Sequence, residues 1–215
     1  MIDFSKYKIL DISPIVSERM AVFPGDVPFS RSVSLDMKNG DNLTLSSLTT
    51  SLHIGAHTDA PIHYNASGVS ADSLPLETYM GLAQVISVPR RSNARIRVSD
   101  LAGKKITASR VLFRTDSFPD PNHWNSDFMS LSAELIDHLA QNKVILVGID
   151  TPSIDPENDK NLESHNAVFR HKMAILEGVV LKSIAEGEYV LLALPLNISG
   201  ADATPVRAVL LEKEK

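Results

Sequence analysis

Three of the seven histidines fall within one short segment, together with an aspartate. The segment runs from His53 through His57 and Asp59 to His63, so its pattern is H-x3-H-x-D-x3-H. An isolated histidine is more often a hydrogen-bonded polar residue than a ligand, but packing alone gives no reason to gather four such groups beside turn-forming residues. Imidazole and carboxylate groups are ligands that divalent metal ions take in proteins. The segment therefore predicts a metal site.

The distance between ligands of one ion constrains the backbone of this segment. Donor atoms lie about 2.0 to 2.2 Å from the ion, so they must lie close to one another. An extended strand would place His53 and His57 about 13 Å apart, whereas a bent or helical turn brings positions i and i+4 to about 6 Å. We therefore expect the chain to bend at Gly55, which lacks a Cβ. Asp59 can then add a carboxylate whose two oxygens bridge a pair of ions.

His63 has a different expected role. Pro61 redirects the chain after Asp59, so His63 need not be a ligand and is free to act as a base. The unperturbed pKa of histidine, near 6.5, suits proton transfer at neutral pH. Three ligands from one segment are enough for a catalytic ion that keeps an open position for water.

A second ion would need further ligands, and the candidates lie between residues 161 and 178. His165 and Glu177 are the obvious pair. A continuous helix would separate them by about 18 Å, so both can reach one ion only if the helix is short and its flanks fold back. Glu163 and His171 compete for the same role, and all of these residues could instead be solvated helix positions.

The elements that position these residues are mainly strands. Short apolar runs rich in Val, Ile and Leu recur between Pro, Gly and Asn clusters. They predict strands at residues 8–12, 43–51, 83–88, 110–114, 144–149, 189–194 and 206–211. We expect a helix at 133–142, with Ser132 as its N-cap, and a second, interrupted helix at 162–176. The irregular strand spacing does not indicate repeated strand–helix–strand units. We expect a mixed α/β fold with a substantial sheet or partly closed, barrel-like core and flanking helices.

Composition limits the classes of protein and partner. A chain of 215 residues with 43% hydrophobic and 22% charged residues fits one domain, 1–215. The absence of cysteine excludes disulfides, zinc–thiolate sites and a thiol nucleophile. A net charge of −5 gives no general attraction to nucleic acid or anionic lipid. We therefore expect a small-molecule partner, with no nucleic acid and no membrane.

The sequence also gives expectations about the cellular location of the protein and about its one basic cluster. The first residues lack the apolar core of a signal segment, and the longest apolar run, 189–198, is shorter than the roughly 20 residues of a membrane span. We expect a cytoplasmic protein. Residues 89–97 form the one basic cluster, which we interpret as a solvated loop or subunit contact, with steering of an anionic ligand as the alternative.

The histidine segment also carries a resemblance to a known family. The run from His53 to Tyr64, H-I-G-A-H-T-D-A-P-I-H-Y, resembles the signature of the metal-dependent cyclase-like hydrolases, and in particular the bacterial-type kynurenine formamidases, or arylformamidases. The similarity continues over nearly the whole chain, in D-I-S-P at 11–14, F-P-G-D at 23–26, G-I-D-T-P-S at 148–153, A-I-L-E-G at 174–178, L-A-L-P-L at 192–196 and P-V-R-A-V-L at 205–210.

The resemblance implies a swivelling β/β/α fold, a ligand set and a reaction. It implies one zinc ion on His53, His57 and Asp59, a second on Asp59, His165 and Glu177, and His63 as proton donor and acceptor. Phe23 stands where formamidases commonly have a substrate-contacting tryptophan, so a contact role is implied without the indole N–H. Ile54 replaces a more usual threonine.

The implied reaction is hydrolysis of N-formyl-L-kynurenine to L-kynurenine and formate, in tryptophan degradation, by a homodimer or larger homo-oligomer. Two divalent ions per subunit are expected, zinc first, with manganese or cobalt as alternatives. One alternative is a related metal-dependent amide or lactam hydrolase, isatin-hydrolase-like or opening a cyclic imide. Another is a non-catalytic metal-binding module. A serine hydrolase is disfavoured because no G-x-S-x-G occurs.

Overall fold

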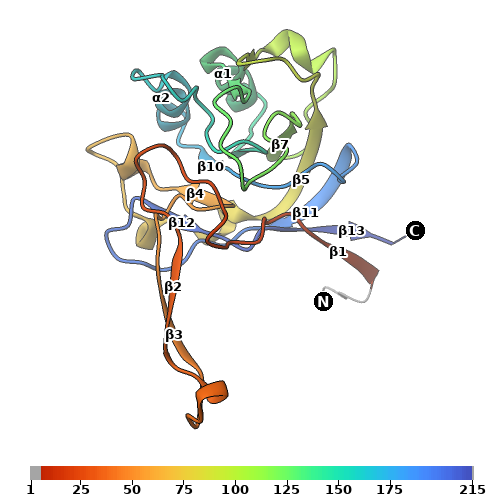
Figure 1. The fold of residues 1–215 in the computed structure, drawn as a ribbon. Helices are drawn as coiled ribbons and strands as arrows, with labels where there is room; N and C mark the ends of the chain where they lie inside the picture. Colours follow the sequence, from red (N-terminus) through yellow and green to blue (C-terminus); the bar gives the residue numbers. More distant parts are fainter. Residues whose placement is uncertain (1–5, 215) are drawn as a thin grey trace.

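The computed structural model describes residues 6–214 and centres on one mixed sheet of seven strands in the order β1-β13-β11-β5-β7-β9-β10 (Figure 1). The first four strands in this order pair antiparallel with one another, and from β5 onward β5, β7, β9 and β10 pair in parallel. The strands are β1 (Tyr7–Asp11), β13 (Val209–Lys213), β11 (Gly187–Leu192), β5 (Met80–Ser87), β7 (Arg110–Arg114), β9 (Leu146–Ile149) and β10 (Ala174–Leu176). The predicted mixed α/β class with a large sheet is confirmed. The first five residues, where the sequence shows no apolar signal core, and Lys215 lie outside the described residues.

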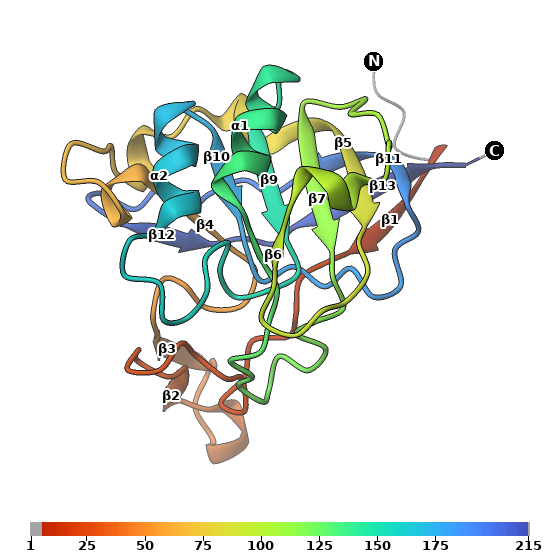
Figure 2. The same ribbon diagram turned by 90° about the horizontal axis from the view of Figure 1, so that it is seen from above.

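Two α-helices cover one face of the parallel half of the sheet within the described chain (Figure 2). They are α1 (Ala133–Gln141), between β7 and β9, and α2 (Glu163–Arg170), between β9 and β10. Each therefore connects two parallel neighbours, and the two consecutive units show that the expectation against repeated strand–helix–strand units was wrong. The N-cap prediction for α1 is confirmed, because the Ser132 hydroxyl accepts the backbone N–H of Leu135 at 3.1 Å.

The second predicted helix, 162–176, is confirmed in its first half and wrong in its second half. α2 ends at Arg170, and Lys172 then adopts a left-handed conformation with φ of 53°. The apolar residues that follow form β10, which pairs in parallel with β9. Backbone hydrogen bonds to the buried strand β9 outweigh the helical spacing of apolar residues in this run. The sequence of the run alone does not reveal that strand β9 lies beside it.

The core lies on both faces of the sheet. Along β7, Val111 and Phe113 pack with Leu135, Ile136 and Leu139 of α1, whereas Leu112 belongs to a second buried cluster on the opposite face. This alternation follows from the two-residue period of a strand. In the described part of the chain, no helix combines the length and apolar character that crossing a membrane requires.

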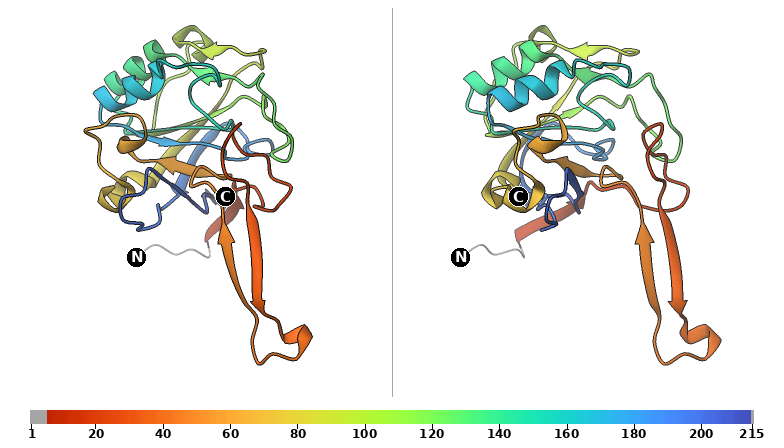
Figure 3. Two further views of the ribbon diagram at one scale, coloured as in Figure 1. Left: turned by 60° about the vertical axis from the view of Figure 1, so that its left-hand side comes forward. Right: turned by 90° about the vertical axis from the view of Figure 1, so that its left-hand side faces the viewer.

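Three two-stranded pieces of sheet complete the described fold. β4 (His57–Asp59) pairs antiparallel with β12 (Ala203–Pro205) and touches the end of β10 through a bridge between His57 and Glu177. β2 (Ser30–Leu35) and β3 (Leu45–Thr49) form a hairpin that projects from the body (Figures 1 and 3). β6 (Arg95–Ile96) and β8 (Ser130–Leu131) pair in parallel.

Candidate metal centre

β4 carries two of the predicted ligands and hides both from solvent. Because side chains alternate along a strand, His57 and Asp59 point to the same face. His57 is 1% exposed and Asp59 2%. Nε2 of His57 lies 3.5 Å from Oδ1 of Asp59. The spacing H-x-D on a strand therefore places an imidazole and a carboxylate side by side in the interior.

His53 reaches the same place through the predicted bend. Gly55 has φ of 60°, in the left-handed region that favours glycine. The turn brings the His53 and His57 rings to a centroid distance of 5.1 Å. Nδ1 of His53 then lies 3.1 Å from Oδ1 of Asp59. The structure brings together the first predicted group of ligands.

The second group comes from α2 and from the residue after β10. His165 lies in the first turn of α2, and its Nε2 is 3.4 Å from Oδ2 of Asp59. It is also 3.8 Å from Oε1 of Glu177. The two residues meet because the helix is short and the chain folds back along β9. A short helix with flanks that fold back is the condition that the sequence analysis set for His165 and Glu177 to reach one ion.

Asp59 lies between the two groups, with one oxygen toward each. The donor atoms of His53, His57 and Asp59 lie within 4.8 Å of one another, as do those of Asp59, His165 and Glu177. Nε2 of His57 and both oxygens of Asp59 are buried without a hydrogen-bond partner. Buried polar atoms are normally satisfied, so orphaned donors and acceptors facing a common point fit bound cations. The residues therefore fit a centre for divalent cations.

The charges in this centre stabilise one another. Burial opposes ionisation of Asp59, but the imidazoles of His165 and His53, 3.4 and 3.1 Å from its oxygens, hold its pKa well below the ordinary value. Burial would lower the pKa of His53, yet Asp59 and Asp202 raise it to about 9. Likewise, Asp155, Asp59 and Glu177 outweigh burial and raise the pKa of His165 to about 10. Negative carboxylates thus prepare the centre to receive positive charge.

His63 lies beside the centre and remains accessible. It ends a short 3-10 helix, Pro61–His63, and its side chain is 35% exposed. Its ring centroid lies 4.2 Å from that of His53 and 6.2 Å from that of His165. Nδ1 of His63 is 3.5 Å from Oδ2 of Asp202. An imidazole in this position can exchange protons with a molecule above the ligands.

The competing candidates for the second group do not reach the centre. Glu163 is exposed and lies 3.8 Å from Arg95. His171 pairs with Asp137 across helices α1 and α2, at 2.7 Å. Each therefore pairs with an oppositely charged residue outside the candidate ligand groups.

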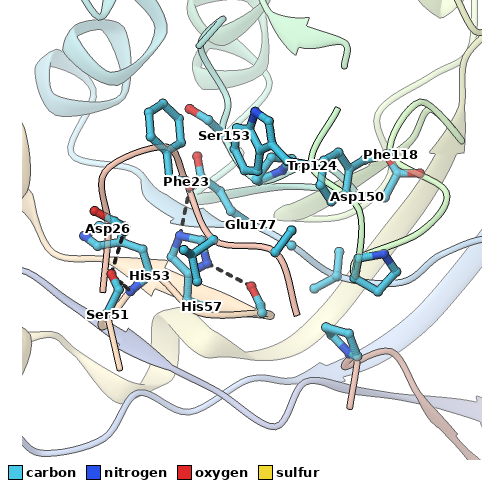
Figure 4. Close-up of a pocket in the computed structure, with 18 of the residues that line it drawn as sticks. Phe23, Asp26, Ser51, His53, His57, Phe118, Trp124, Asp150, Ser153 and Glu177 are labelled. Atoms are coloured by element: carbon cyan, nitrogen blue, oxygen red, sulfur yellow. Dashed lines mark hydrogen bonds and ion pairs between the residues drawn. The ribbon is translucent and has the colours of Figure 1, made fainter. Parts of the chain in front are cut away.

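A cavity of about 540 Å³ opens onto the candidate ligands. This volume suits a small organic molecule. Its other wall is aromatic, with Phe23 and Trp124 facing each other edge to face at a centroid distance of 5.1 Å (Figure 4). Phe118 packs against Trp124 at 5.7 Å. Phe23 therefore lines the cavity that opens onto the candidate ligands.

Several residues around the cavity had weak or no sequence signals. Trp124 lines the cavity and donates its indole N–H to Glu157 at 2.8 Å. Burial raises the pKa of Asp150 to about 6, and this carboxylate anchors the loop beyond β7 by accepting the backbone N–H groups of Thr115 and Asp116. These contacts link residues far apart in the sequence, so no local pattern predicts them.

The fold and the ligand groups define a mixed α/β protein with a candidate centre for divalent ions, and comparison with known proteins identifies its family. Residues 10–156 match the model of the family described as "Putative cyclase". The match covers His53, His57, Asp59 and His63, and it ends before His165 and Glu177. The chain belongs to this cyclase family.

Solved structures share the fold over nearly their whole length. A potential metal-dependent hydrolase with cyclase activity is 26% identical, with a TM-score of 0.82 over 97% of this chain and 100% of that one. A predicted metal-dependent hydrolase from Bacillus stearothermophilus is 26% identical, with a TM-score of 0.81 over 96% and 99%. Isatin hydrolase A from Labrenzia aggregata, bound to benzyl benzoate, is 20% identical, with a TM-score of 0.82 over 98% and 95%. The last likeness concerns the fold alone.

Proposed function

We propose that this protein is a metal-dependent arylformamidase that hydrolyses N-formyl-L-kynurenine to L-kynurenine and formate in tryptophan degradation. The observation that carries the proposal is the position of Asp59, whose Oδ1 faces His53 and whose Oδ2 faces His165. The accessible imidazole of His63 lies beside it, at the floor of an aromatic cavity. Similarity to formamidases in the motifs of the chain selects this substrate among amides.

The chemistry divides between bound ions and His63. Two divalent ions on these ligands would lower the pKa of a bound water and polarise the formamide carbonyl. His63 would accept a proton from the attacking water and return it to the aniline nitrogen as the C–N bond breaks. Asp202, near Nδ1 of His63, favours a proton on that nitrogen and leaves Nε2 for the transfer.

Phe23 and Trp124 supply the proposed binding surface for the aryl ring. Their edge-to-face packing holds both rings at the cavity wall. Aromatic side chains contribute large apolar contact areas and prefer offset or edge-to-face partners. A formanilide ring suits this wall, and Phe23 offers contact without an N–H donor.

Zinc is the proposed ion, with manganese and cobalt as alternatives. Nitrogen and carboxylate donors suit several divalent metals, so availability also affects which ion is bound. Elemental analysis of protein purified without added metal tests this part, and we expect close to two zinc ions per chain.

The main alternative is a related lactam or cyclic-imide hydrolase. The isatin hydrolases share the fold of this chain, and a bicyclic lactam also suits a cavity with an aromatic wall. A non-catalytic metal-binding module is the alternative of another class. Structural zinc sites are normally closed by four protein ligands, which disfavours a module here.

A homo-oligomer and a cytoplasmic location belong to the proposal as well. The β2–β3 hairpin supports self-association, because Leu45 and Leu48 are 53% and 65% exposed. A two-stranded hairpin is marginally stable alone in water, and a second copy of the chain would cover it. Light scattering would give the mass, and we expect at least a dimer.

The test of the proposed function is a substrate panel measured before and after chelation. We expect the highest kcat/KM with N-formyl-L-kynurenine, loss of turnover on chelation and recovery with zinc. Preference for isatin or a cyclic imide would favour the lactam hydrolase. Metal binding without turnover of any substrate would favour the module, and turnover that survives complete metal removal would contradict the mechanism.

A further inference from the structure

A buried carboxylate, that of Asp155, lies behind His165 on the side away from Asp59. Oδ2 of Asp155 accepts the Nδ1–H of His165 at 2.7 Å, and the side chain of Asp155 is 1% exposed. The same carboxylate accepts the backbone N–H groups of Ser164 and His165 at 3.1 Å. The residue at the N-cap of α2, Leu162, has no side chain that can cap the helix. Asp155 therefore caps α2 and orients the imidazole in its first turn.

This contact fixes which nitrogen of His165 faces the centre. A carboxylate can only accept, so Nδ1 carries a hydrogen, and Nε2 is the nitrogen that faces Asp59 and Glu177 and is left to bind an ion. His57 is oriented similarly by a backbone group, since its Nδ1–H donates to the carbonyl of Gly55 at 3.0 Å. His165 differs from His57 because its Nδ1 partner is a buried carboxylate, that of Asp155, rather than a backbone carbonyl.

Arg95 holds that charge in place. Nη1 of Arg95 donates to Oδ1 of Asp155 at 2.6 Å, to the carbonyl of Leu131 at 2.7 Å and to the hydroxyl of Ser164 at 3.0 Å. Nη2 donates to Asp159. Its side chain is 22% exposed. Arg95 belongs to the basic cluster at 89–97, yet it faces inward, so the solvated-loop interpretation was wrong for this residue.

We propose that Asp155 is a positioning residue that sets the tautomer and orientation of His165 for the ion shared with Asp59 and Glu177, and that Arg95 keeps Asp155 in register. A partner that accepts the outer N–H of a metal-bound histidine fixes the ring and raises the basicity of the ligand. The inference rests on the proposed metal centre, but not on the identity of the substrate.

Zinc titration against a competing chelator tests the role of Asp155. Asp155→Asn keeps the shape of the side chain but removes the charge, and its amide can offer a donor to His165. We expect the affinity for one of the two zinc ions to fall about 10- to 100-fold, while the other is retained. The matched control is Asp137→Asn, which alters a similar aspartate–histidine pair with His171, 2.7 Å apart, outside the centre. We expect the control to bind both ions as the wild type does.

A second measurement needs no variant and so does not depend on folding of Asp155→Asn. Imidazole ¹⁵N and ¹H correlation spectra of the zinc-loaded wild type report the tautomer of each histidine. We expect His165 to carry its proton on Nδ1. Arg95→Lys should give a smaller loss of zinc affinity, because it keeps the charge but not the planar set of donors.

The outcomes separate this inference from the proposed function. Unchanged zinc affinities in Asp155→Asn, or a proton on Nε2 of His165, would overturn the positioning role alone. A wild type that binds no zinc would overturn the metal centre and the positioning role together. Failure to hydrolyse N-formyl-L-kynurenine would overturn the proposed substrate, while the zinc titrations would still decide the role of Asp155.

Discussion

His57 and Glu177 exchange both of their backbone hydrogen bonds, at 3.1 and 2.9 Å, and Nε2 of His57 lies 3.1 Å from Oε2 of Glu177. This bridge joins β4 to the end of β10. It therefore brings the first group of candidate ligands, which comes from one short segment, against the second, which depends on the main sheet. The backbone contact sets the distance between the groups before any ion binds.

Gly178 makes that contact possible, and its replacement should separate the two groups. A Cβ at Gly178 would lie 2.0 Å from the carbonyl oxygen of Gly55, which is backbone and cannot move aside cheaply. Gly178→Ala should therefore lose several kcal/mol of stability and most of its bound zinc. Thermal unfolding and elemental analysis measure the two effects.

The control for Gly178 is Gly200→Ala. Both glycines have positive φ, 65° and 72°, but nothing lies within 4 Å of a Cβ at Gly200. The control should lose only the cost of a left-handed alanine, about 1 to 2 kcal/mol. Equal losses in the two variants would mean that backbone conformation, rather than the close approach to Gly55, determines the effect.

Asp59→Asn should remove more metal than any other single ligand change. Asp59 faces both groups, so the substitution weakens both sites at once, whereas His53→Ala should affect mainly one. We expect Asp59→Asn to retain well under one zinc per chain and to lose turnover. Retention of two zinc ions by this variant would show that Asp59 does not bridge them.

The His63→Ala variant should keep its bound zinc, and its kcat should fall. Removing a general acid–base group costs about 10² to 10⁴ in rate. Because His63 is proposed as the acid–base group rather than as a ligand, zinc content should match the wild type, which elemental analysis checks alongside kcat. Metal-free protein from this variant would instead make His63 a ligand.

The stability of metal-free protein should fall as the pH rises. The folded-state pKa values of His53 and His165 are raised to about 9 and 10, so their stabilisation is complete below the unfolded value near 6.5 and is lost as pH rises through 9 and 10. The lowered pKa of Asp59 acts oppositely, and its contribution is lost in acid, below the ordinary value of 3.8. Metal-free protein should be most stable between about pH 4 and 6.5.

Zinc should reverse this trend, because the metal binds neutral imidazole and competes with protons. The difference in Tm between zinc-loaded and metal-free protein should therefore grow from pH 6 to pH 9. Differential scanning calorimetry at several pH values measures it. A difference that shrinks with pH would contradict the assignment of His53 and His165 as ligands.

Local patterns predicted the first half of the centre well. His53, His57, Asp59 and His63 lie within one segment, and ligand geometry required the bend that Gly55 makes. Strand β7 was predicted at its observed bounds because its alternating apolar residues face two clusters of the core.

The second half could not be predicted from spacing. Whether His165 and Glu177 meet depends on where α2 ends and on the pairing of β10 with β9. The resemblance to formamidases, not the local pattern, singled out the pair that the structure brings together. Asp155 and Arg95 carried no local signal, because their contacts connect a loop, a short strand and a helix.

Anomalous diffraction at the zinc edge, from crystals grown with zinc, tests the metal centre most directly. We expect two peaks, one among His53, His57 and Asp59 and one among Asp59, His165 and Glu177, with the carboxylate of Asp59 between them. A map without a peak at these residues, with their side chains turned apart, would contradict the account.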